Sequence, residues 1–314
     1  MKRLQNRIAE SGLTLPIAVV YAICVWAIVM FVGSLSVFSW PQAVCYIAST
    51  YMMVEINNSN ALLRVRSRMV ATTFLFLSCM YVSGFHSLID NLGQVGFIAT
   101  ILLLFTTYQE KDSSGKTYYA FLFLAASSLL YAEYLYYVPL LWILMISRLQ
   151  SFSWRTFIAS ILGVITPYWF VSIWLFYIWD FTPLTRHLSD LDTFIFPADY
   201  LAVTTEQWLV FVFIIIISIA GIIHFWKYSY EDKIHIRQLF GFFIAINLLT
   251  LLFIAIQPHL YNALIRIAII SASPIAAHFL TLTSSKLSNI AFFVILTLCI
   301  LITAANTWMP FLNF

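Results

Sequence analysis

The long apolar runs constrain this chain more than any other feature. One is "TLPIAVVYAICVWAIVMFVG" at 14–33, and similar runs recur to the C-terminus, separated by short polar segments. A membrane-spanning helix needs about 17–25 mostly apolar residues. Backbone polar groups in lipid must be satisfied within the segment, so each run is predicted to be a helix. The predicted helices cover 14–33, 41–60, 69–86, 95–109, 117–131, 135–147, 156–179, 207–226, 238–256, 264–283 and 288–306.

The composition also indicates that the chain folds in a lipid bilayer. The 314 residues are 62% hydrophobic and 9% charged, whereas soluble domains are about 45–50% apolar and about 25% charged. We therefore expect one integral membrane domain over 1–314, an all-α polytopic bundle of about eleven helices. The bilayer is the predicted partner, and no basic groove indicates nucleic acid. The chain lacks nucleotide-loop, zinc-protease and hydrolase-elbow motifs, so no cofactor is evident.

The basic residues predict the orientation. Lys and Arg are enriched in cytoplasmic segments of membrane proteins. With the N-terminus in the cytoplasm and the helices alternating, all but two of the 16 Lys and Arg residues fall on the cytoplasmic side. The exceptions are Arg186 and Arg266. The C-terminus is then expected on the periplasmic side of a cell inner membrane.

The longest polar segment is 180–206, an outer loop between the seventh and eighth predicted helices. It contains Arg186, His187, Asp190 and Asp192. An acid that acts as base or metal ligand beside a phosphate-binding cation is the minimum for an active site. A D-x-D pair can hold a divalent cation through its oxygens, although the metal stays unknown. The alternative is a solvated acidic loop, and 185–196 also suits a short helix along the surface.

The runs 117–131 and 135–147 are short and are joined by "YAEYLYYV". We expect a tight helical hairpin whose tip holds Glu133 among four tyrosines, near the membrane interface. Whether 117–147 spans the bilayer or re-enters it stays open. Glu133 is a third candidate catalytic acid.

Arg266 lies near the start of an apolar helix on the side where cations are avoided. An unpaired arginine there is costly. We expect it to bind a phosphate or to pair with an outer acid, such as Glu133 or one in 180–206.

A carboxylate and three amides close the second helix. Glu55, Asn57, Asn58 and Asn60 precede Arg64, Arg66 and Arg68. A helix starting at Pro41 needs these polar residues to complete the span, so they lie within the membrane. They are expected to face other helices or a cavity. Glu55 is then either a proton- or ligand-handling group or part of an interhelical hydrogen-bond cluster.

The segment "YAEYLYYVPLLWILMISRLQSFSWRTFIASILGVITPYWFV" (131–171) carries a resemblance. Its tyrosine hairpin, Trp154, Arg155, Gly163 and the Pro167–Tyr168 pair resemble an uncharacterised family of multi-pass inner-membrane proteins of Bacteroidota. The segment is more loosely similar to GT-C-type membrane glycosyltransferases, which use polyprenyl-phosphate sugars at a periplasmic site. The GT-C class has an acid in its first outer loop. Here that loop, "SLSVFSWPQ", has none, so Asp90 or 180–206 would replace it.

Three classes of function follow from these patterns. The first is a protein of envelope biogenesis that handles a lipid-linked sugar at the periplasmic face. The second is a non-catalytic membrane subunit or scaffold that contacts other membrane subunits. The third is a transporter or flippase that uses Glu55.

Overall fold

The computed structural model describes residues 3–31, 40–85, 87–189, 191, 200, 203–283 and 285–312. All regular elements in these ranges are helical. The α-helices are α1 Leu4–Glu10, α2 Thr14–Phe31, α3 Trp40–Asn60, α4 Met69–Met80, α5 Leu88–Phe105, α6 Ser114–Ser128, α7 Tyr137–Leu144, α8 Trp154–Ile178, α9 Thr182–Ser189, α10 Thr205–Tyr228, α11 Ile234–Ile256, α12 Tyr261–Leu282 and α13 Lys286–Leu312. Short 3-10 turns include η1 Val82–Phe85, η2 Ala132–Tyr136 and η7 Pro258–Leu260.

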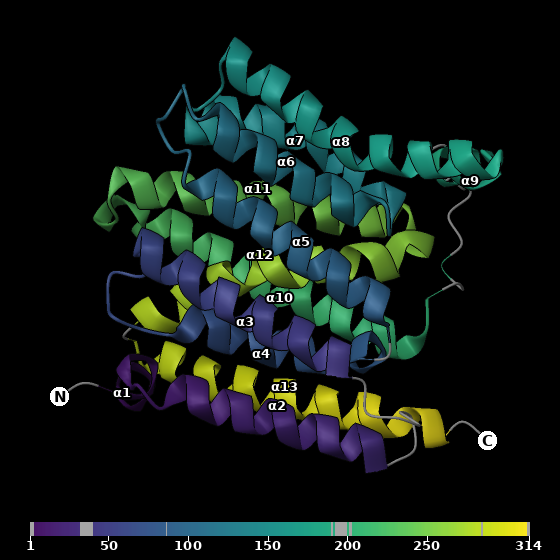
Figure 1. Cartoon of the computed structure of the whole chain (residues 1–314). Coiled ribbons are helices and arrows are strands. Elements are labelled where there is room, and N and C mark those ends of the chain that lie inside the picture. The colour runs from purple at the N-terminus through teal and green to yellow at the C-terminus, as the bar shows by residue number, and fades with distance from the viewer. Residues whose placement is uncertain are drawn as a thin grey trace.

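Helix α12 forms the centre of the bundle. It packs against α4, α5, α10 and α11 (Figure 1), and 94% of its span is buried by protein. Its sequence "SASPIAAH" (271–278) is rich in small residues, which let neighbouring helices approach closely. At Gly221 of α10, an added Cβ would lie 2.8 Å from the backbone oxygen of Ile275. A helix so enclosed by protein has little contact with lipid, so α12 can carry polar side chains such as Arg266 and His278.

Seven helices in the described part of the chain are long and apolar enough to cross a bilayer. The protein is therefore a membrane protein of the all-α class, as predicted. Each predicted apolar segment overlaps a helix. However, α3, α6 and α7 are too short or too polar to count among the seven, and α4 is a shorter apolar helix. The crossing number of about eleven thus stays a prediction.

The turn η2 joins α6 to α7 as predicted, but α6 packs on α5 and α8 rather than on α7, so the two helices do not form the tight hairpin that we expected. The turn contains Glu133, and a π-helical turn, Met145–Leu149, extends α7. Tyr137 is buried, and its hydroxyl lies 2.7 Å from Thr250 Oγ1 of α11. The start of α7 is thus fixed to α11.

The connections gather at two ends of the bundle. At one, the basic end, Arg64 Nε lies 2.8 Å from Asp232 Oδ1, and Arg155 Nη1 lies 3.3 Å from Asp112 Oδ1. At the other, which we call the acidic end because Asp90 lies there, the His187 ring lies 2.8 Å from the backbone oxygen of Ser128. Helix α2 begins at the basic end and α13 ends at the acidic end (Figure 1).

The segment 180–206 contains helix α9. Asp180 accepts hydrogen bonds from the Thr182 hydroxyl and backbone N–H, and these bonds lower the pKa of its carboxyl group. The expected surface helix thus begins a little earlier than 185. Asp190 and Asp192 lie outside the described residues.

Candidate functional site

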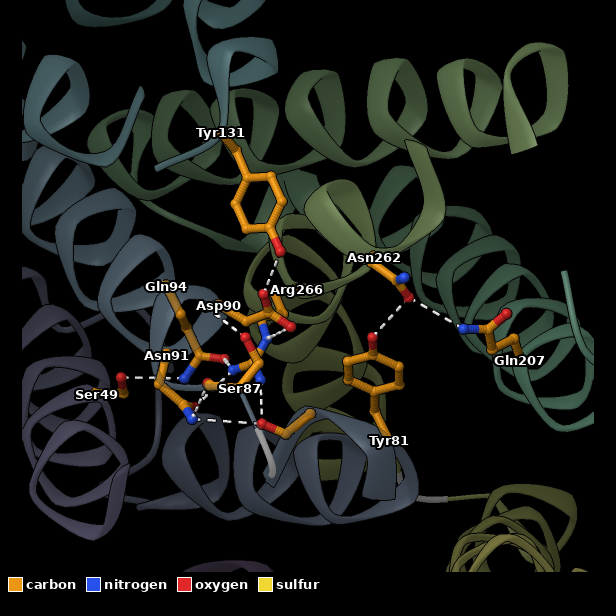
Figure 2. A network of polar contacts seen from close by, with 11 residues as sticks. Ser49, Tyr81, Ser87, Asp90, Asn91, Gln94, Tyr131, Gln207, Asn262 and Arg266 are labelled. Atoms are coloured by element: carbon orange, nitrogen blue, oxygen red, sulfur yellow. Dashed lines mark hydrogen bonds and ion pairs between the residues drawn. The ribbon is translucent and has the colours of Figure 1, made fainter. Parts of the chain in front are cut away.

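The candidate site surrounds Arg266, whose exposed fraction is 1%. Its Nη1 donates to Asn91 Oδ1 at 2.8 Å and to Gln94 Oε1 at 3.0 Å. Its Nη2 donates to the backbone oxygen of Gly84. Figure 2 shows these acceptors converging on the guanidinium from α5 and η1. A buried charge persists only when it is paired and hydrogen-bonded, and three neutral oxygens supply the hydrogen bonds.

The start of α5 positions the polar side chains. Ser87 caps this helix, because its side chain accepts the backbone N–H of Asp90 at 3.2 Å. Asp90 then lies in the first turn, where the helix dipole favours a carboxylate. Asn91 and Gln94 are three residues apart and share one face of the helix. Local capping thus directs an acid and two amides to the same side.

Asp90 supplies the countercharge. Its Oδ2 lies 3.9 Å from Arg266 Nε, and its Oδ1 accepts the hydroxyl proton of Tyr131. At an effective dielectric constant of about 20, two charges this far apart attract by roughly 4 kcal/mol. The 3.9 Å separation exceeds hydrogen-bond length, and Arg266 Nε is buried without a hydrogen-bond partner. Along this edge of the guanidinium, Asp90 therefore acts through charge and not through a hydrogen bond.

A second layer of side chains fixes this arrangement. Gln94 Nε2 donates to Ser49 Oγ of α3 at 3.0 Å, which turns its oxygen toward Arg266. The Tyr81 ring lies 5.7 Å from the guanidinium carbon, within cation–π range. Its hydroxyl and Gln207 Nε2 donate to Asn262 Oδ1 at 2.9 and 3.0 Å. Figure 2 shows this branch extending away from Asp90.

The other predicted outer residues do not join Arg266 in the described part of the chain. Glu133 is half-buried in η2. Arg186 is exposed on α9, where it lines a hollow with His187, Thr182 and Pro183. No hydrogen bond or ion pair connects these residues to Arg266. The outer acid beside Arg266 is Asp90, and the predicted phosphate-binding role of Arg186 and His187 remains a prediction.

The polar end of α3 lies at the basic end. Asn57 is buried, and its amide donates to the Ser67 backbone oxygen at 2.9 Å. Asn60 bonds within its own helix, to the Ile56 oxygen at 3.0 Å, while Asn58 is exposed. Glu55 is half-buried, and its carboxylate makes no hydrogen bond or ion pair with the described residues. Asn57 therefore holds the α3–α4 turn, and Glu55 is available for another role.

Two features of the sequence indicate the residues of this site, although the apolar runs alone do not. The run 95–109 suggests a helix start at 95, whereas α5 begins at Leu88. Ser87 three residues before Asp90 is a typical N-cap spacing, and it places Asp90, Asn91 and Gln94 on the helix. Likewise α12 begins at Tyr261 after Pro258, which places Arg266 about one turn deeper than expected from 264.

Within the described residues, no three His, Cys, Asp or Glu side chains are arranged to hold a metal ion. The predicted divalent cation depends on Asp190 and Asp192, so it stays a prediction. The described residues thus supply an acid and a cation that lie 3.9 Å apart and are both buried. Comparisons with protein families, curated proteins and solved structures gave no match for this chain.

Proposed function

We propose that this multi-pass protein of a bacterial inner membrane handles a lipid-linked sugar phosphate at the acidic end of the bundle, facing the periplasm, in envelope biogenesis. The observation that carries the proposal is the buried Asp90–Arg266 pair, in which no hydrogen bond joins the two charged groups. Its unbonded Nε and nearby carboxylate offer an anion site and a base within 3.9 Å. The resemblance of 131–171 to the uncharacterised family of Bacteroidota and to GT-C-type glycosyltransferases agrees with it.

The proposed reaction is sugar transfer from a polyprenyl phosphate to an acceptor hydroxyl. The acceptor oxygen attacks the anomeric carbon, and the bond from that carbon to the phosphate oxygen breaks. Asp90 takes the hydroxyl proton, and Arg266 stabilises the negative charge on the departing phosphate. Because the Tyr131 hydroxyl donates to Oδ1, Oδ2 is the Asp90 oxygen that accepts this proton.

The orientation rests on charge. The basic segments meet at one end of the bundle, and Arg266, Asp90 and α9 lie at the other. Because basic segments stay in the cytoplasm, the acidic end faces the periplasm in this proposal.

Binding of a polyprenyl phosphate to the purified protein, measured by native mass spectrometry, tests the proposal. We expect the phosphate to bind more tightly than the corresponding polyprenol. Arg266→Gln removes this preference, whereas Asp90→Asn retains it and fails to complement a gene deletion. Arg66→Gln, at the basic end, is the control. Equal binding of phosphate and polyprenol contradicts the proposal.

The loop acids are tested in parallel. If Asp190→Asn with Asp192→Asn abolishes complementation and Asp90→Asn does not, the base lies in 180–206 and the role proposed for Asp90 is wrong. Full complementation by all of these variants contradicts an enzymatic role.

A transporter or flippase is the second candidate. It is favoured by the Glu55 carboxylate, which is half-buried and has no partner among the described residues. Intramembrane carboxylates often mark proton relays in pumps and transporters. In that case Glu55→Gln abolishes complementation while Asp90→Asn does not.

A further inference from the structure

The other end of α12 carries a second buried ionisable cluster. The side chains of His278 and Asp232 are 0% exposed, and His278 Nε2 lies 3.1 Å from Asp232 Oδ2. His224 of α10 is also buried, and its Nδ1 lies 3.2 Å from His278 Nδ1. Three residues from different elements thus form one continuous chain of hydrogen bonds at the basic end.

Arg64 closes this chain toward the surface. Its Nε lies 2.8 Å from Asp232 Oδ1, and its Nη1 pairs with Glu231. The Arg64 side chain is 27% exposed, in contrast to the fully buried Asp232. Arg64 and His278 therefore share a single carboxylate, one from the solvent side and one from the core.

The hydrogen bonds fix the tautomers. Asp232, ion-paired with Arg64, acts as an acceptor, so His278 Nε2 carries the proton between them. In a neutral His278 ring, Nδ1 is then an acceptor, and His224 Nδ1–H donates to it. The free acceptor of the pair is therefore His224 Nε2.

Aromatic rings enclose the two imidazoles. The rings of Phe225 and Phe240 lie 5.3 and 4.9 Å from His278, and Phe279 lies 5.6 Å from His224. The other titratable groups at the pair are Arg64, Glu231, Asp232 and Tyr228. In this apolar enclosure, Asp232 is the charge that stabilises an added proton.

We propose that His224, His278 and Asp232 form a proton-binding site whose occupancy Arg64 controls. A proton binds at His224 Nε2, and the Nδ1 proton of His224 transfers to His278 Nδ1. The positive charge then rests on His278, beside Asp232, and the N–H···N bond between the rings reverses direction. Arg64 opposes this step because it neutralises the same carboxylate. The site is separate from Arg266, and its assignment does not depend on the proposed sugar transfer.

Solid-state ¹⁵N NMR of histidine-labelled protein in proteoliposomes tests the site. Variants His224→Gln and His278→Gln assign the two signals. We expect both rings to titrate together, as coupled groups do, with His278 protonated at Nε2 in the neutral state. Independent titration, or a neutral His278 protonated at Nδ1, contradicts the proposal.

Variants of the charged neighbours give shifts of opposite sign. Arg64→Gln leaves Asp232 uncompensated, so the joint midpoint should rise by about one pH unit or more, the usual effect of a charge at this range. Asp232→Asn should lower it. Arg66, also exposed in the same segment but without an ion pair in the described residues, gives a matched control, Arg66→Gln, with no shift. If Asp232→Asn does not fold, Arg64→Gln alone decides, because an unchanged or lowered midpoint contradicts the proposal.

Discussion

At the scale of single residues, the stability of the protein depends on how the helix bundle accommodates a buried arginine. Arg266 combines one distant carboxylate with three neutral oxygens. Such a pair is stable only while both charges and their hydrogen bonds are present, because either charge left alone in the core is costly.

Removal of Arg266 should therefore destabilise the protein through Asp90. We expect Arg266→Gln to cost about 3–5 kcal/mol of unfolding free energy, the usual effect of breaking a buried pair. The double variant with Asp90→Asn should recover part of this loss. Unfolding of purified protein in detergent measures both, and strictly additive losses would show that the two charges are not coupled.

Gly84 gives an independent test of the packing around the guanidinium. An added Cβ would lie 2.6 Å from Arg266 Nη2 and 2.6 Å from Tyr81 Cδ1. Both side chains are held by the network, so Gly84→Ala should lower stability by about 1–3 kcal/mol, as overpacking does. Gly115→Ala is the control, because nothing lies within 4 Å of its added Cβ. Equal melting temperatures for the two variants would mean that the Arg266 network is loose.

The sequence indicates that Arg266 is unusual, but it does not identify the residues that pair with it. Its position on the acidic side follows from charge alone. Its pairing with Asp90 depends on the start of α5 at Leu88 and on the packing of α5 against α12. Neither the hydropathy pattern nor the charge pattern of the sequence predicts this packing.

At the scale of elements, the sequence predicts where the apolar helices lie, but it misses the starts of α5 and α12 and the pairings of the helices. The turn between α6 and α7 follows from two short runs around a tyrosine-rich segment, but the packing of α6 on α5 and α8 does not. Helix α8 packs mainly on α6, and only 11% of its span is buried. Its large exposed side chains include Trp169, Phe170 and Trp174. This face contacts lipid, or another subunit if the scaffold alternative holds.

The contact between α6 and α8 depends on Gly163. An added Cβ there would lie 2.5 Å from the Tyr118 backbone oxygen and 3.1 Å from the Leu122 nitrogen. Close backbone approach of this kind requires a small residue. Gly163→Leu should separate the two helices, which spin-label distances between α6 and α8 would reveal as a longer and broader distribution. An unchanged distribution would contradict the close contact.

At the scale of the whole molecule, charge divides the bundle. The proton site at the basic end and Arg266 at the acidic end both lie on or beside α12, which is the most enclosed of the seven long apolar helices in the described part of the chain. The sequence predicts this division because it depends only on the order of basic and apolar segments. It cannot predict which helix is central, since burial by protein and burial by lipid select the same apolar side chains.

Labelling of single cysteines tests the central claim, that the acidic end faces the periplasm. In a background without Cys24, Cys45, Cys79 and Cys299, one cysteine replaces exposed Thr185 on α9 and another replaces exposed Gly115 on α6. A membrane-impermeant maleimide added to spheroplasts should label Thr185→Cys, and Gly115→Cys only after permeabilisation. The reverse pattern would place Arg266 and Asp90 at the cytoplasmic face and contradict the account.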